Sequence, residues 1–105
     1  MLHVRAKAIR WVSDLPQPGL VEVSLTDAHG IERRFVDKWP IFTADNLTSN
    51  TSYPVDVSID CDAVARTTDS SGHEIVVVST AMPWGVVTVD GVDQFEVAAD
   101  QLVAR

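Results

Sequence analysis

The feature that most constrains this chain is a regular alternation of apolar and polar side chains on both sides of a short turn, across residues 21–36. The turn at residues 27–30 reads DAHG, which is typical of a three-residue loop whose glycine takes the left-handed backbone conformation. This turn predicts an antiparallel hairpin with Val23 opposite Phe35. A slip of one residue would bury charge, so we expect the register to be firmly held.

The predicted register divides the hairpin into one apolar and one wettable face. The apolar face carries Val21, Val23, Leu25, Ile31 and Phe35. The opposite face carries Glu22, Ser24, Thr26, Glu32 and Arg34. Such a pair of faces is typical of an antiparallel sheet that covers a single core.

Further strands are predicted at residues 2–11, 55–63 and 74–79, where alternation or a short apolar run lies between turn signals. We expect the strand at 74–79 to be central and covered on both faces. In the first strand the phase changes at Ile9 and Trp11, which predicts a bulge or a strand that crosses between sheets. Turn-forming residues predict loops at 13–19, 43–54 and 66–72.

A second hairpin is predicted near the end of the chain. Asp90-Gly91 is typical of a two-residue type I′ turn between β-forming runs, and it would place Val86 opposite Phe95. Residues 98–103 are long enough for one helical turn. The chain is therefore predicted to be all-β, a single small antiparallel β-sandwich or partly open β-barrel of about seven strands. It would form one domain over residues 1–105.

Composition and cysteine content are those of an ordinary globular protein. Hydrophobic residues make up 46% of the chain and charged residues 22%, which excludes a disordered chain. The single cysteine, Cys61, rules out an internal disulfide framework, and its apolar strand position predicts a buried thiol and not a nucleophile. We find no secretory signal and no run long enough to span a bilayer, so we expect a cytoplasmic protein.

The formal net charge of −7 is unevenly distributed. Residues 1–38 hold six basic and five acidic side chains, a sum of +1, whereas residues 39–105 hold two basic and ten acidic side chains, a sum of −8. This acidity argues against nucleic acid and favours a basic protein as partner. We expect no membrane partner, and a homodimer can form if an edge strand such as residues 2–11 is exposed.

Three carboxylates, Asp56, Asp60 and Asp62, are the candidate partner-binding residues. They alternate with the apolar positions of the strand at 55–63, on its other face, and carboxylates at alternate positions of a strand lie about 7 Å apart. This spacing is too wide for two carboxylates to share a proton, and it suits contact with a basic partner. The alternative is a solvated strand face that also discourages edge-to-edge pairing.

Three aromatic side chains, Trp39, Tyr53 and Trp84, are the candidate ligand-pocket residues. Each adjoins a proline, which places these large rings at strand ends or in loops. Such rings can wall a small-molecule pocket. The alternative is that they cap the ends of a small barrel, whose corners need large side chains.

No sequence motif indicates catalysis, a metal or a cofactor. The histidines, His3, His29 and His73, lack the spacing of metal ligands. There is no nucleophile elbow and no phosphate-binding loop. We therefore predict no catalytic residues, no metal site and no cofactor, although catalytic sets in β folds can assemble from distant strands.

Several segments resemble a family of small bacterial proteins. They are VEV at 21–23, FVDK at 35–38, PWGV at 83–86, and the run from FEV at 95–97 to QLV at 101–103. The likeness covers most of the chain, and the family is β-rich and uncharacterised. The resemblance implies no activity and carries over no functional residue.

Two classes of function follow from these observations. The first is a non-enzymatic interaction module whose acidic surface binds a basic protein. An immunity or inhibitor protein that neutralises a cationic toxin or nuclease is one form of it. The second is a small-molecule-binding β-barrel with an aromatic-lined pocket.

Overall fold

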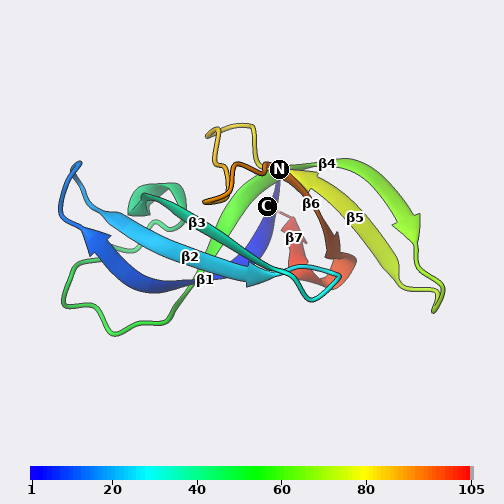
Figure 1. The fold of residues 1–105 in the computed structure, drawn as a ribbon, viewed down its shortest axis with the longest axis horizontal. Helices are drawn as coiled ribbons and strands as arrows, with labels where there is room; N and C mark the ends of the chain where they lie inside the picture. The colour runs from blue at the N-terminus through cyan, green and yellow to red at the C-terminus, as the bar shows by residue number, and fades with distance from the viewer. Residues whose placement is uncertain (105) are drawn as a thin grey trace.

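The structure is a computed structural model that describes residues 1–104, and in this range it contains seven strands and two short 3₁₀ helices. The strands are β1 (Leu2–Ser13), β2 (Leu20–Thr26), β3 (Glu32–Lys38), β4 (Val55–Thr68), β5 (Glu74–Ser79), β6 (Gln94–Ala98) and β7 (Leu102–Ala104). The 3₁₀ helices are η1 (Trp39–Ile41) and η2 (Ala99–Gln101). All described strand pairs are antiparallel, and the sheet curls into an open half-barrel (Figure 1). The all-β fold and its partly open barrel form are therefore confirmed.

The strand order is β3-β2-β1-β4-β5-β6, with β7 also paired to β1. Strand β1 therefore lies inside the sheet, and our expectation that residues 2–11 offer an exposed edge is wrong. Strand β4 is long enough to pair first with β1 and then, from Asp62 to Thr68, with β5. The β4–β5 hairpin extends away from the rest of the molecule (Figure 1).

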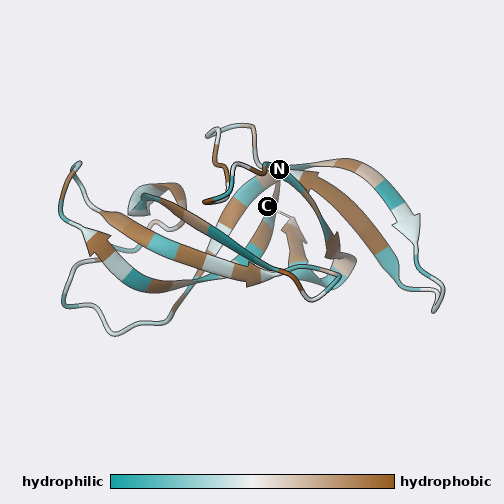
Figure 2. Ribbon diagram, viewed as in Figure 1, coloured by the Kyte–Doolittle hydropathy of each residue, from teal (hydrophilic) through white to brown (hydrophobic). Residues whose placement is uncertain are grey.

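The central hairpin has the predicted register, with Val23 opposite Phe35. The phase change in β1 is a register shift between Ala8 and Arg10, as predicted for a bulge. Apolar and polar residues alternate along the strands (Figure 2), and the apolar ones line the inside of the curl. The core side chains without any exposed surface are Val4, Ala8, Val21, Val23, Phe35, Ile59, Cys61, Val76, Val78 and Val97.

Two residues of the hairpin depart from the predicted faces. Ile31 is 49% exposed because it precedes β3 and lies in the turn, outside the curled sheet. Glu22, which we expected on a wettable face, is only 1% exposed. Arg10 on β1 donates from Nε to Glu22 Oε1 at 2.5 Å, and Arg34 on β3 pairs with Glu22 Oε2. Long side chains from both neighbouring strands thus cover a carboxylate that the alternating sequence pattern predicted to be exposed to solvent.

Glu22 makes the stability of the fold sensitive to acid. Burial alone would raise the pKa of the Glu22 carboxyl, but hydrogen bonds from Arg34 and Arg10 and their positive charges lower it below its ordinary value of 4.5. The folded state therefore binds this proton less readily than the unfolded state. Its stabilising effect is present above about pH 5 and is lost as the pH falls through the folded-state pKa.

We therefore expect the free energy of unfolding to decrease on acidification below about pH 5, and to decrease less steeply in the Glu22→Gln variant. One titrating proton changes the slope by at most about 1.4 kcal/mol per pH unit. Urea unfolding at a series of pH values measures both slopes. Equal slopes in the wild type and the variant would show that Glu22 is not held by this pair of arginines.

The second predicted hairpin is wrong. Phe95 lies on β6, which pairs with β5, so its strand partner is Val78 and not Val86. Residues 84–89 form no strand. The turn at Asp90-Gly91 is present but sits in a three-residue loop, because the Thr88 N–H donates to the Val92 carbonyl at 2.8 Å.

Two other segments differ from the prediction because neighbouring strands extend or add pairings that local patterns do not report. Strand β4 continues to Thr68, into the predicted loop at 66–72. Residues 98–103 form the expected single turn, η2, and then the unpredicted strand β7, which pairs with the start of β1. Strand β5 is central as expected, with Val76 and Val78 fully buried on one face and Ile75 buried on the other.

Candidate protein-interaction site

Trp84, in the loop between β5 and β6, is a large apolar side chain fixed at the surface. Its side chain is 55% exposed. The indole Nε1 donates a hydrogen bond to Asp60 Oδ2 on β4, at 3.1 Å. The structure therefore joins one residue of the predicted partner-binding row to one residue of the predicted ligand pocket.

The loop that carries Trp84 is pinned at both ends. Thr80 Oγ1 donates to the Val86 carbonyl at 2.6 Å, and the Val86 N–H donates to the Thr80 carbonyl at 3.1 Å. Val86 is buried in the core, so residues 81–85 form an arch outside it. Gly85 has φ +66°, which lets the chain turn back towards the core. Within the arch, Met82 is also 62% exposed.

The three predicted partner-binding carboxylates, Asp56, Asp60 and Asp62, lie in different surroundings. Asp56 forms an ion pair with Lys7, with Nζ and Oδ1 at 2.5 Å, and this hydrogen bond lowers the pKa of the Asp56 carboxyl. Asp60 is half-buried beside Trp84. Asp62 is exposed and follows Asp60 on the same face of β4, about 7 Å along the strand. We define the Trp84 surface as Asp60, Asp62, Met82 and Trp84.

Trp39 and Tyr53 lie elsewhere. Trp39 donates from Nε1 to the Pro18 carbonyl at 3.3 Å, and the Tyr53 hydroxyl donates to the Thr48 carbonyl at 2.8 Å. Both rings are half-buried and pack against the core. Burial raises the pKa of the Tyr53 hydroxyl. No contact described within residues 1–104 joins either ring to Trp84.

Cys61 is fully buried, as predicted. Burial raises the pKa of its thiol to about 11, and the charges of Asp62 and Asp60 contribute to the increase. The thiol is therefore protonated at neutral pH and is a poor nucleophile.

No three His, Cys, Asp or Glu side chains within residues 1–104 are grouped so that they could hold a metal ion. No helix in the same range has both the length and the apolar character needed to cross a membrane.

Comparisons with protein-family models, curated proteins and solved structures found no match. The resemblance to a small bacterial family stays a prediction.

Proposed function

We propose that this protein is a non-enzymatic interaction module that binds a basic segment of a partner protein through the Trp84 surface. The observation that carries the proposal is the exposed Trp84 ring held by its hydrogen bond to Asp60. An inhibitor or immunity protein for a cationic toxin or nuclease is one specific form of this function.

An exposed tryptophan supports binding because of its size and its fixed position. Tryptophan is enriched among the few interface residues that contribute most of the binding energy. The Asp60 hydrogen bond and the pinned arch restrict the Trp84 ring before any partner arrives, so less conformational entropy is lost on binding. Met82 on the same arch adds a flexible apolar side chain that adapts to a partner surface.

The charges around this ring favour a basic partner. Asp62 provides an exposed carboxylate on β4, and Asp60 adds its negative charge beside the ring although its Oδ1 is buried. The chain from residue 39 onward carries a formal charge of −8. A guanidinium or ammonium group can contact the exposed face of an indole and a carboxylate together. Complementary charge also speeds association and helps to select the partner.

Capture from a lysate of the source organism tests this function. The wild-type protein is expected to retain a basic partner at low salt and less of it at moderate salt, because exposed charges are screened. An Asp60→Asn/Asp62→Asn double variant should retain at least about tenfold less, as expected when charged hydrogen bonds are lost.

The matched control is an Asp45→Asn/Asp100→Asn double variant, which removes two exposed carboxylates elsewhere. It should retain the partner like the wild type. The proposal fails if no basic partner is retained at low salt, or if both double variants lose it equally.

A further inference from the structure

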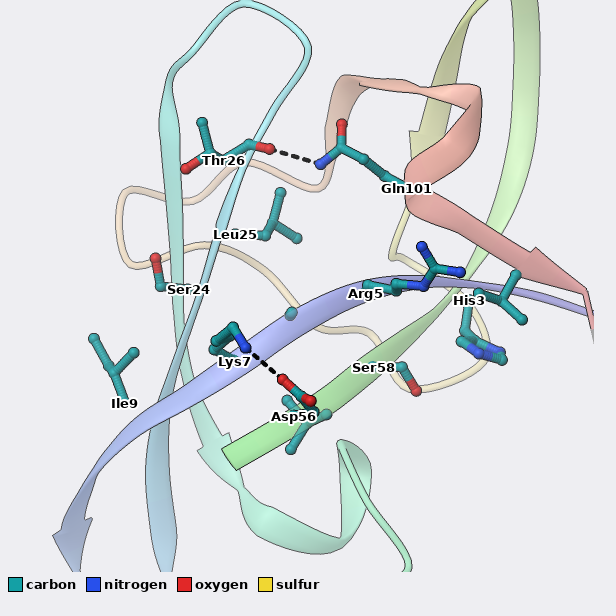
Figure 3. Close-up of a pocket in the computed structure, with 13 residues that line it drawn as sticks. His3, Arg5, Lys7, Ile9, Ser24, Leu25, Thr26, Asp56, Ser58 and Gln101 are labelled. Atoms are coloured by element: carbon teal, nitrogen blue, oxygen red, sulfur yellow. Dashed lines mark hydrogen bonds and ion pairs between the residues drawn. The ribbon is translucent and has the colours of Figure 1, made fainter. Parts of the chain in front are cut away.

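A cavity lies where β1 changes its partner along one edge (Figure 3). Strand β7 pairs with β1 as far as Val4, and β2 pairs with it from Lys7 onward, so Arg5 and Ala6 lie between the two. The cavity in this gap has a volume of about 800 Å³ and opens to solvent. Its size falls within the range of about 300–1,000 Å³ that is usual for small-molecule sites.

One side-chain hydrogen bond joins the two sides of this gap. Gln101 donates from Nε2 to the Thr26 carbonyl at the end of β2, at 2.7 Å (Figure 3). Gln101 Oε1 accepts the Ala98 N–H at 2.8 Å, so both ends of its amide are engaged. Because η2 and β2 are connected in this way, the cavity is formed before a ligand enters.

Arg5 provides the excess positive charge in the cavity wall. The other pair of charges there is balanced, because Lys7 Nζ lies 2.5 Å from Asp56 Oδ1. Arg5 donates from Nη1 to the Asp100 carbonyl at 3.1 Å, and it takes part in no ion pair described within residues 1–104. A guanidinium has five N–H donors, so others can bind an acidic ligand.

Half of the ten other lining residues are polar, His3 among them, but most of the lining surface is apolar. Leu25 and Val103 line it from β2 and β7. Ser58, which lies directly opposite Arg5 in the β1–β4 pairing, adds a hydroxyl. A ligand that fits this lining has an anionic group at one end and an apolar body at the other.

We infer that this cavity binds a small organic acid, with its carboxylate on the Arg5 guanidinium and its apolar body against Leu25 and Val103. Guanidinium and carboxylate match in a planar, two-bond geometry, and burial of the apolar body adds affinity. Trp39, Tyr53 and Trp84 do not line this cavity, although His3, which does, lies opposite Asp60 in the β1–β4 pairing.

Calorimetric titration with hexanoate tests the site, with hexanol and inorganic phosphate as comparison ligands. Hexanoate should bind saturably and more tightly than either. Hexanol lacks the carboxylate, and phosphate lacks the apolar body. Arg5→Gln should weaken hexanoate binding at least about tenfold, as expected for a charge-assisted pair. Ser58→Phe keeps every charge but fills the cavity, and it should weaken hexanoate binding as well.

The matched control is Arg66→Gln, which removes an exposed cation from the far end of β4. It should bind hexanoate like the wild type, and so should Trp84→Ala. Unchanged far-ultraviolet circular dichroism shows that each variant is folded. The inference is overturned if hexanoate does not bind the wild type, if Arg5→Gln binds it equally well, or if hexanol or phosphate binds as tightly.

Discussion

Replacing Phe35 with alanine is expected to lower the free energy of unfolding by about 3–5 kcal/mol. Phe35 on β3 has no exposed surface, and its ring centroid lies 6.1 Å from that of Phe95 on β6. These two strands are the first and last of the sheet order, so the contact joins the two ends of the half-barrel. A domain of this size is typically stable by only about 5–15 kcal/mol. Urea unfolding of both proteins measures the loss.

The control for Phe35 is Ile31, which the alternation placed on the same face of the hairpin but which is 49% exposed. Ile31→Ala should change the free energy of unfolding by no more than about 0.5 kcal/mol. A similar loss in both variants would contradict the described curl of the sheet. A loss of less than about 1 kcal/mol for Phe35→Ala would contradict it as well, because replacing a buried phenylalanine with alanine typically costs about 3–5 kcal/mol.

Replacing Trp84 with alanine is expected to weaken binding of the basic partner by about 30-fold or more, which is the effect of a central interface residue. The free energy of unfolding should change by less than about 1 kcal/mol, because the ring is 55% exposed and lies outside the core. Surface plasmon resonance with the captured partner measures the affinity, and urea unfolding measures the stability. The substitution thus separates binding from folding.

Two further variants show which part of the Trp84 side chain matters. Trp84→Phe keeps an aromatic ring but loses the N–H that donates to Asp60. Its affinity for the partner should therefore lie between those of the wild type and Trp84→Ala. Leu15→Ala removes a still more exposed apolar side chain from the β1–β2 loop and should have no effect on binding. Full affinity in Trp84→Ala, or an equal loss in Leu15→Ala, would contradict the role given to this ring.

The elements that the sequence predicted correctly are those in which local chemistry determines the structure. The turn at 27–30 sets the pairing of Val23 with Phe35, and a bulge follows from the phase change in β1. Alternation correctly placed Cys61 in the core. Alternation reports which way a side chain points, but it does not report whether a neighbouring strand covers that face. Glu22 was therefore misplaced, since the arginines that cover it come from two other strands.

The candidate site was only partly predictable. Asp60 and Trp84 were each identified from sequence, but in two separate hypotheses. They are 24 residues apart, and no periodic pattern connects a strand position with a loop position at that distance. A proline and a glycine on either side of Trp84 did indicate a loop. The cavity beside Arg5 had no sequence signal, because it arises where β2 and β7 share one edge of β1 and β7 was not predicted.

The most direct test of the Trp84 surface follows the indole N–H resonances of the three tryptophans by NMR while an oligoarginine peptide is added. Trp11 and Trp39 donate these protons to Asp14 and to the Pro18 carbonyl, so they serve as internal controls. We predict that the Trp84 resonance alone shifts saturably, and that added salt reverses the shift. A Trp84 resonance that does not move, or three resonances that move equally, would contradict a binding surface at this residue.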